Sequence, residues 1–382
     1  MPEAGAPMQL ARQQAPGQRG DALAQVDTPA LLLDLDAVQT NMAQVHGRVL
    51  ARGLALRAHV KAHKCPELAR LQLAHGATGI CCQKASEAQV FAAAGFKDIL
   101  VTNQLVGPRK LARVAEIAAD GARVGICVDH VLQVEQAALA ASQAGSVLEV
   151  LVEVDIGHGR CGVTDASAAL ALARAIAAHP RALRFAGLHA FRGSAQHMRE
   201  PQQRRAAVDA AVARLRGVVD LLASAGFACP TITGGGTGTY ALEAASGLYT
   251  EVQPGSYVLM DLDYAANRVE AGETPLAHAL TVLCTVISTS AGRAVLDGGL
   301  KAFSVDQGLP RMLLPGWTVR SLSDEHAVIE RGEGAAALAV GDKVQLVPGH
   351  CDPTVNLHDW ILACRQARVE AAWPVAARGA LF

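Results

Sequence analysis

Apolar segments of strand length recur along the chain, and stretches with helical spacing separate them. In residues 57–64 (RAHVKAHK), the four odd positions carry basic or ionisable side chains, Arg57, His59, Lys61 and His63, and the even positions between them carry apolar ones. Such alternation is typical of a strand with two unlike faces. Together with seven later segments it predicts eight strands, at 56–62, 79–84, 98–103, 123–129, 148–155, 185–191, 231–237 and 251–258.

Eight strands separated by helices predict a (β/α)8 barrel. A doubly wound sheet is the alternative, but the strand count and the glycine-rich turn after the seventh strand favour the barrel. From about residue 275 the pattern becomes strand, turn, strand, which indicates an all-β second domain. Segment 30–38 is assigned to that domain because the barrel is complete without it. We therefore predict a flexible tail at 1–25, a barrel at 40–270, and a β domain formed by 26–39 and 271–382.

Composition narrows the class of function. The chain has 382 residues, a net charge of -1 and 18% charged residues, which argues against binding to nucleic acid or a membrane surface. Its nine cysteines include no CxxC pair, so they indicate reduced thiols and disfavour a structural zinc site. The first 25 residues lack the apolar core of a signal peptide. These features predict a cytoplasmic protein that acts on a small molecule.

Lys61 lies near the carboxyl end of the first predicted barrel strand, where barrels carry their reactive groups. Burial among cationic neighbours is expected to lower its pKa and make it a Schiff-base nucleophile. The alternative is a structural lysine paired with Glu153 or Asp155.

The segment TITGGGTGT (231–239) follows the seventh strand. Consecutive glycines let backbone N–H groups approach a phosphate closely, although a plain tight turn would also explain them. Together with Lys61, this loop suggests pyridoxal 5′-phosphate (PLP). Arg160, in GHGRCG (157–162), could hold the phenolic oxygen of this cofactor or a substrate carboxylate, or lie in a surface loop.

A second candidate site lies in PGHCDPTVNLHD (348–359). His350 and Asp352 are two residues apart and would project to one side of an extended segment, as ligands of a divalent ion. A turn capped by Asp352 explains the stretch nearly as well, and His358 with Asp359 is a competing pair. In FRGSAQHM (191–198), Phe191 could lie against a flat cofactor ring, and His197 is a candidate general base.

Several motifs in order resemble the metal-dependent D-threonine aldolases and D-3-hydroxyaspartate aldolases, which are fold-type III PLP enzymes with an alanine-racemase-like barrel. The resemblance runs from about residue 27 to the end of the chain. It is carried by HVKAHKCPELA, GICCQKASEA, VDIGHGRCGV, TITGGGTGTY, VQPGSY, MDLDY, SDEHA and PGHCDPT.

The resemblance implies that Lys61 carries PLP and that His197 is the base. It also implies that His350 and Asp352 bind a metal ion, with Mn²⁺ expected and Mg²⁺, Co²⁺ or Zn²⁺ as alternatives. The remaining expected cofactor contacts are the phosphate-loop amides and a set around the ring: Gly235, Gly236, Thr237, Gly238, His59, Gln83, Arg160, Phe191 and Tyr257. Such enzymes are usually homodimers, in which the β domain of one subunit would bring the metal motif to the other's PLP.

The implied reaction is retro-aldol cleavage of a D-3-hydroxy amino acid to glycine and an aldehyde. The nearest alternative is a PLP- and metal-dependent D-serine or D-3-hydroxyaspartate dehydratase, which would release ammonia. A PLP carrier without activity and a PLP-free metal hydrolase are further alternatives. Phe191 stands where relatives commonly have tyrosine. Arg192 could contact a second substrate carboxylate, which would favour 3-hydroxyaspartate, or it could face solvent.

Overall fold

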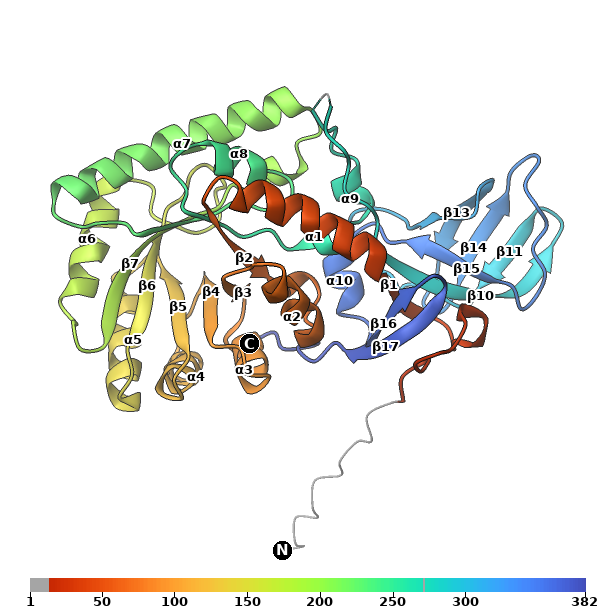
Figure 1. Cartoon of the computed structure of the whole chain (residues 1–382), viewed down its shortest axis with the longest axis horizontal. Coiled ribbons are helices and arrows are strands. Elements are labelled where there is room, and N and C mark those ends of the chain that lie inside the picture. The colour runs from red at the N-terminus through yellow and green to blue at the C-terminus, as the bar shows by residue number, and fades with distance from the viewer. Residues whose placement is uncertain (1–13, 271) are drawn as a thin grey trace, which may run out of the picture.

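The computed structural model describes residues 14–270 and 272–382, which form a closed barrel and a separate sheet (Figure 1). The barrel has eight parallel strands, and each overlaps one of the predicted segments. The predicted fold class is therefore confirmed. The strands are β2 (Ala55–His59), β3 (Gly79–Cys82), β4 (Asp98–Gln104), β5 (Arg123–Val128), β6 (Leu148–Glu153), β7 (Leu183–Ala190), β8 (Thr231–Gly234) and β9 (Glu251–Val252).

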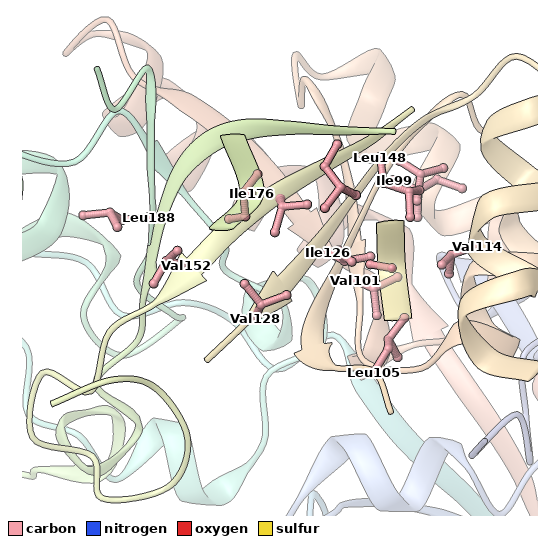
Figure 2. Close-up of a cluster of buried hydrophobic side chains, with 14 of the residues drawn as sticks. Ile99, Val101, Leu105, Val114, Ile126, Val128, Leu148, Val152, Ile176 and Leu188 are labelled. Atoms are coloured by element: carbon pink, nitrogen blue, oxygen red, sulfur yellow. The ribbon is translucent and has the colours of Figure 1, made fainter. Parts of the chain in front are cut away.

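Alternation along the strands separates the two faces of the barrel wall. On β5, Ile126 and Val128 point outward toward the surrounding helices. They share one apolar cluster with Val114 and Ile176, which lie on those helices (Figure 2). Cys127, between them, points into the barrel and packs in an inner layer of small and apolar side chains. Burial of each outward aliphatic side chain stabilises the fold by about 1.5–3 kcal/mol.

Helices surround the barrel and connect it to the sheet. Among the described residues, no helix is both long and apolar enough to cross a membrane. The α-helices are α1 (Leu35–Leu50), α2 (Pro66–Ala74), α3 (Ala85–Ala93), α4 (Pro108–Ala119), α5 (Val131–Ala144), α6 (Ala166–Ala177), α7 (Pro201–Ser224), α8 (Tyr240–Ala245), α9 (Leu262–Ala265) and α10 (Cys351–Val355). The 3₁₀ helices are η1 (Leu23–Gln25), η2 (Val60–Ala62), η3 (Gly193–His197) and η4 (Ser256–Val258).

The second sheet combines an N-terminal strand with the C-terminal third of the chain. Strand β1 (Ala30–Asp34) pairs antiparallel with β10 and parallel with β16, in the order β13-β14-β11-β10-β1-β16-β17. Strand β15 pairs with β10 and β12. The other strands are β10 (Leu280–Ser290), β11 (Arg293–Leu296), β12 (Arg311–Met312), β13 (Trp317–Leu322), β14 (Ala327–Arg331), β15 (Lys343–Val347), β16 (Trp360–Arg365) and β17 (Arg368–Pro374).

The expectation of a loose tail over 1–25 is wrong for residues 14–25. The N–H of Gly20 donates to Val369 O at 2.8 Å, and the N–H of Val369 donates to Asp21 O at 2.9 Å. These backbone bonds attach the segment to β17. They also pair N–H and C=O groups that β17, as an edge strand, would otherwise leave unpaired. Residues 1–13 lie outside the described residues.

The basic face of RAHVKAHK is divided among three environments. Arg57 lies inside the barrel, where Nε contacts Glu251 at 3.0 Å and Nη1 contacts Asp98 at 2.6 Å. Strand β2 ends at His59, so Lys61 lies on η2 and not on the strand that the alternation predicts. His63 is buried against α2, with Nε2 3.1 Å from Gln72 Oε1.

Candidate active site

Lys61 lies at the mouth of the barrel and meets the β domain there. Its Nζ is 2.6 Å from Asp352 Oδ2, and its side chain is 40% exposed. The turn η2 directs it outward, because the N–H groups of His63 and Lys64 both bond to Val60 O and curl the chain after β2. A partner subunit is therefore not needed to bring the metal motif to Lys61, because Lys61 and Asp352 meet within one chain.

The expected direction of the Lys61 pKa is wrong for this structure. Burial disfavours the ammonium form, but the adjacent Asp352 carboxylate outweighs burial and raises the pKa of Lys61. Burial would likewise raise the pKa of Asp352, yet the Lys61 ammonium holds that pKa well below its usual range. The cationic neighbours considered from the sequence matter less than this one carboxylate.

His350 and Asp352 lie at the start of α10, so the extended segment that the sequence predicts does not reach Asp352. His350 caps the helix in an extended conformation, and Asp352 lies in its first turn. His350 Nδ1 is 2.7 Å from Asp306 Oδ2, so Nε2 is available to a metal ion. Histidine ligands commonly donate their other ring N–H to a carboxylate, which fixes the tautomer and ring orientation. Asp352 Oδ1 accepts a bond of 3.1 Å from Ser256 Oγ.

The competing pair, His358 and Asp359, makes other contacts. His358 Nε2 is 3.0 Å from Ala302 O, and Asp359 pairs with Arg378 at 2.5 Å. Cys351 is fully buried.

Replacing Asp306 with asparagine is expected to weaken metal binding at His350 by about 10–100-fold. Asparagine can present its NH₂ group to Nδ1, and it removes the negative charge that makes the imidazole a better ligand. Metal titration of the purified variant, followed by calorimetry, measures the change. Asp324→Asn, an exposed aspartate in the same domain, is the matched control and should leave affinity unchanged. An unaltered affinity in Asp306→Asn would remove Asp306 from this role.

The glycine-rich loop follows β8 and is packed so closely that side chains would not fit. A Cβ on Gly236 would lie 2.6 Å from Gln196 Oε1, and one on Gly238 would lie 2.4 Å from Gln196 O. Gly235 has φ +72°, a conformation that favours glycine. Among the described residues, the N–H groups of Gly236 and Thr237 meet no acceptor, and the buried Thr237 Oγ1 has no partner. In contrast, the N–H of Gly238 donates to Gln196 Oε1 at 3.0 Å.

His59 and Gln83 form a small polar group at the ends of β2 and β3. Gln83 Nε2 lies 3.0 Å from His59 Nε2 and 3.0 Å from the hydroxyl of Thr102. Burial and the nearby Lys61 ammonium lower the pKa of His59 well below its usual value. His59 is therefore a neutral imidazole, and its Nδ1 is buried without a partner.

Phe191 and Arg160 lie together beside the glycine loop. The Arg160 guanidinium is 5.8 Å from the centre of the Phe191 ring, and a Cβ on Gly236 would lie 3.2 Å from Phe191 Cε2. Arg160 Nη2 is also 4.0 Å from Glu153 Oε1. Arg192 does not simply face solvent, because its Nη1 donates to Ile156 O at 2.7 Å.

His197 lies on η3 next to α9. Its Nδ1 is 2.5 Å from Asp263 Oδ2, and its ring centre is 5.3 Å from that of Tyr264. A carboxylate at Nδ1 orients the imidazole so that Nε2 can exchange a proton. Asp263 and Tyr264, together with Ser256 and Asp306, are site residues that the sequence prediction missed. Asp263 and Tyr264 lie in MDLDY, one of the motifs that carry the family resemblance.

The structure does not support Tyr257 as a cofactor contact. Its hydroxyl is fully buried between α1 and α2, 2.6 Å from His46 Nε2 and 3.0 Å from Gln72 Nε2. The 3₁₀ turn η4 directs this aromatic side chain into the core, whereas the preceding Ser256 points to Asp352.

Comparison with known proteins identifies the family. The model of the alanine racemase N-terminal domain matches residues 33–263, and that of a serine dehydratase domain matches residues 279–364. A D-threonine aldolase from Arthrobacter sp. is 46% identical over 366 residues, 95% of this chain and 96% of that protein. A 3-hydroxy-D-aspartate aldolase from Paracoccus denitrificans (strain Pd 1222) is 44% identical over 365 residues, 93% of each chain. The chain belongs to this aldolase family.

The solved structure of a D-threonine aldolase from Filomicrobium marinum agrees with this assignment. It matches with a TM-score of 0.93 and 42% identity, over 96% of this chain and 100% of that one. A D-threo-3-hydroxyaspartate dehydratase from Delftia sp. (strain HT23) has a lower identity of 31%, over 87% of this chain and 93% of that protein. The predicted family and its fold-type III barrel are therefore confirmed.

The residues present fit the two groups that this PLP-dependent aldolase family implies. A phosphate could accept bonds from the unpartnered Gly236 and Thr237 amides and from Thr237 Oγ1, and Lys61 offers an amine at the same mouth. His350 Nε2 and the Asp352 carboxylate offer two ligands to a divalent ion. Among the described residues, no third His, Cys, Asp or Glu completes a group with them, so substrate and water would fill the remaining positions.

Proposed function

We propose that this chain is a PLP- and divalent-metal-dependent aldolase. It cleaves D-3-hydroxy amino acids, such as D-threonine, D-allo-threonine, D-3-hydroxyaspartate or aryl-serines, to glycine and an aldehyde. The enzyme is thus a carbon–carbon lyase of the aldehyde-lyase class, in agreement with its relatives. The observation that carries the proposal is the distance of 2.6 Å between Lys61 Nζ and Asp352 Oδ2. It joins the amine expected to bind PLP to a carboxylate expected to bind the metal.

Each residue at the mouth has a defined task in this reaction. Bound PLP supplies the electron sink for cleavage of the Cα–Cβ bond. His350 and Asp352 would hold a divalent ion, which would supply Lewis-acid chemistry. His197 removes the β-hydroxyl proton at Nε2, while Asp263, 2.5 Å from Nδ1, stabilises the imidazolium that results. Phe191 and Arg160 lie beside the phosphate loop, where Phe191 would lie against the cofactor ring and Arg160 would hold its phenolic oxygen or a substrate carboxylate.

Exposure of the base agrees with its task. The His197 side chain is 45% exposed, whereas Asp263 is 3% exposed. A proton taken up at Nε2 can therefore pass to water or to the departing product, while the buried carboxylate stays beside Nδ1.

The dehydratase alternative shares the fold, the cofactor and the substrate class. A dehydratase expels the β-hydroxyl and releases ammonia with a keto acid, whereas an aldolase releases glycine. The purified protein should be supplied with D-threonine, L-threonine and D-3-hydroxyaspartate, with and without Mn²⁺, and both products should be measured. We expect glycine from the D-substrates only, and only with metal present. Ammonia in place of glycine would establish the dehydratase instead.

Three finer points extend the proposal. Mn²⁺ is the expected ion, since one imidazole, one carboxylate and open positions for oxygen ligands suit it. A homodimer is expected from the resemblance. A cytoplasmic location is expected because the cysteines are all free and most of them are buried. Light scattering at several protein concentrations measures the oligomeric state, and activity recovered with each metal in turn ranks the ions.

A further inference from the structure

Three side chains with metal-binding atoms, none of them part of the His350 motif, meet inside the barrel. Cys127 on β5, Glu153 at the end of β6 and His189 on β7 offer a thiol, a carboxylate and an imidazole. Their ligand atoms all lie within 4.8 Å of one another, the one such group among the described residues. The three residues are only 1%, 4% and 2% exposed.

A chain of hydrogen bonds fixes the tautomer of His189. The Glu251 carboxylate, held by Arg57, accepts the Thr233 hydroxyl at 2.8 Å. The Thr233 oxygen in turn accepts Nε2 of Gln253 at 2.7 Å. Gln253 therefore presents its amide oxygen to His189 Nε2 at 3.3 Å, so Nε2 of His189 carries the hydrogen. Nδ1 is then the ring nitrogen that remains to meet another partner.

Nδ1 of His189 faces a carboxylate. Nδ1 of His189 is buried without a hydrogen-bond partner and lies 3.7 Å from Glu153 Oε1. This distance is too long for a hydrogen bond. It is close to the separation of about 3.4 Å between two ligands of a tetrahedral ion whose bonds are about 2.1 Å long. A buried ring nitrogen without a hydrogen-bond partner and a buried carboxylate oxygen at this separation have the geometry of two ligands on one cation.

The existing neighbours do not fill this role. Gln104 Nε2 donates to Glu153 Oε2 at 2.5 Å, which leaves Oε1 directed toward His189 and Cys127. The Arg160 guanidinium is 4.0 Å from Oε1, at the limit of an ion pair, and its side chain is 49% exposed. The Arg160 side chain can therefore stay at the solvent-exposed mouth of the barrel and leave free the space between His189 Nδ1 and Glu153 Oε1.

We propose that Cys127, Glu153 and His189 form a second metal site, separate from His350 and Asp352. A thiolate ligand selects a thiophilic divalent ion of the Zn²⁺ class over Mg²⁺ or Mn²⁺. On binding, Cys127 releases its thiol proton to water, and the fourth position of the tetrahedron takes a water molecule. Gln253 and Gln104 hold the two other ligands in place, as hydrogen-bond partners do at metal sites. The ion would tie three adjacent strands together below the mouth.

X-ray absorption at the zinc edge, with metal analysis of the dialysed holoenzyme, tests this site. With Zn²⁺ supplied, we expect two equivalents per chain and a sulfur neighbour at about 2.3 Å. Cys127→Ser should bind one equivalent and lose the sulfur signal. The matched control is Cys351→Ser, which alters the buried thiol between His350 and Asp352 and should keep both the second equivalent and the sulfur signal.

Two results would overturn the site: a single equivalent without sulfur in the unaltered protein, or a sulfur signal that disappears in Cys351→Ser but persists in Cys127→Ser. If Cys127→Ser does not fold, Glu153→Gln preserves side-chain volume and should also reduce binding to one equivalent. Failure here is distinguishable from failure of the proposed aldolase. Glycine formation reports on Lys61 and His350, whereas the sulfur signal reports on Cys127.

Discussion

Replacing Lys61 with alanine is expected to lower the rate of glycine formation by on the order of 10³-fold or more. The variant should also lose the visible absorption of bound PLP. Lys61 Nζ is the amine that lies at the barrel mouth against Asp352, so its removal deletes the group expected to bind the cofactor covalently. Steady-state assays and an absorption spectrum of the purified variant measure both effects.

Lys61→Arg is the matched control for the ion pair. Arginine keeps a positive charge near the half-buried Asp352 carboxylate but cannot form a Schiff base. We expect it to be as inactive as Lys61→Ala but less destabilised, since the alanine leaves Asp352 without its counter-ion. A Lys61→Ala protein that stays yellow and resists bleaching by borohydride would show that another group holds the cofactor.

Replacing Asp352 with asparagine is expected to lower activity by on the order of 10²-fold or more. Lewis-acid stabilisation contributes several kcal/mol, and about 1.4 kcal/mol corresponds to a tenfold change in rate. The side-chain shape is preserved, so the loss reports on the charge that binds the ion. Activity measured against Mn²⁺ concentration should require much more metal in the variant than in the unaltered protein.

Asp359→Asn is the matched control for Asp352→Asn, because Asp359 lies seven residues further along and pairs with Arg378 at the surface. It should leave the metal dependence unchanged. Removal of metal from the unaltered protein by EDTA should have the same effect as Asp352→Asn, and added Mn²⁺ should restore the rate. Cleavage at the full rate after EDTA treatment would contradict a role for the metal.

The barrel could be predicted because its signal is local. Each strand alternates between residues that pack on the helices, such as Ile126 and Val128, and residues that fill the interior, such as Cys127. The glycine loop could be predicted for the same reason, since three adjacent glycines after a strand indicate a turn whose backbone can be approached closely. Local patterns of this kind depend only on neighbouring residues.

The parts that could not be predicted depend on contacts between distant segments. Lys61 and Asp352 are 291 positions apart, so no local pattern shows that a carboxylate raises the lysine pKa. The role of Asp306 is hidden in the same way, 44 positions from His350. The Cys127 group is spread over three strands, and the absence of a CxxC pair says nothing about it. Tyr257 was misplaced because a 3₁₀ turn directs it away from its neighbour Ser256.

A crystal structure of the holoenzyme grown with Mn²⁺ tests most directly whether one chain builds the whole centre. Anomalous scattering locates the ion independently of the protein density. We expect density that joins PLP to Lys61 Nζ, and a manganese peak between His350 Nε2 and the Asp352 carboxylate of the same chain. PLP on another lysine, or manganese bound to neither residue, would contradict the active site described above.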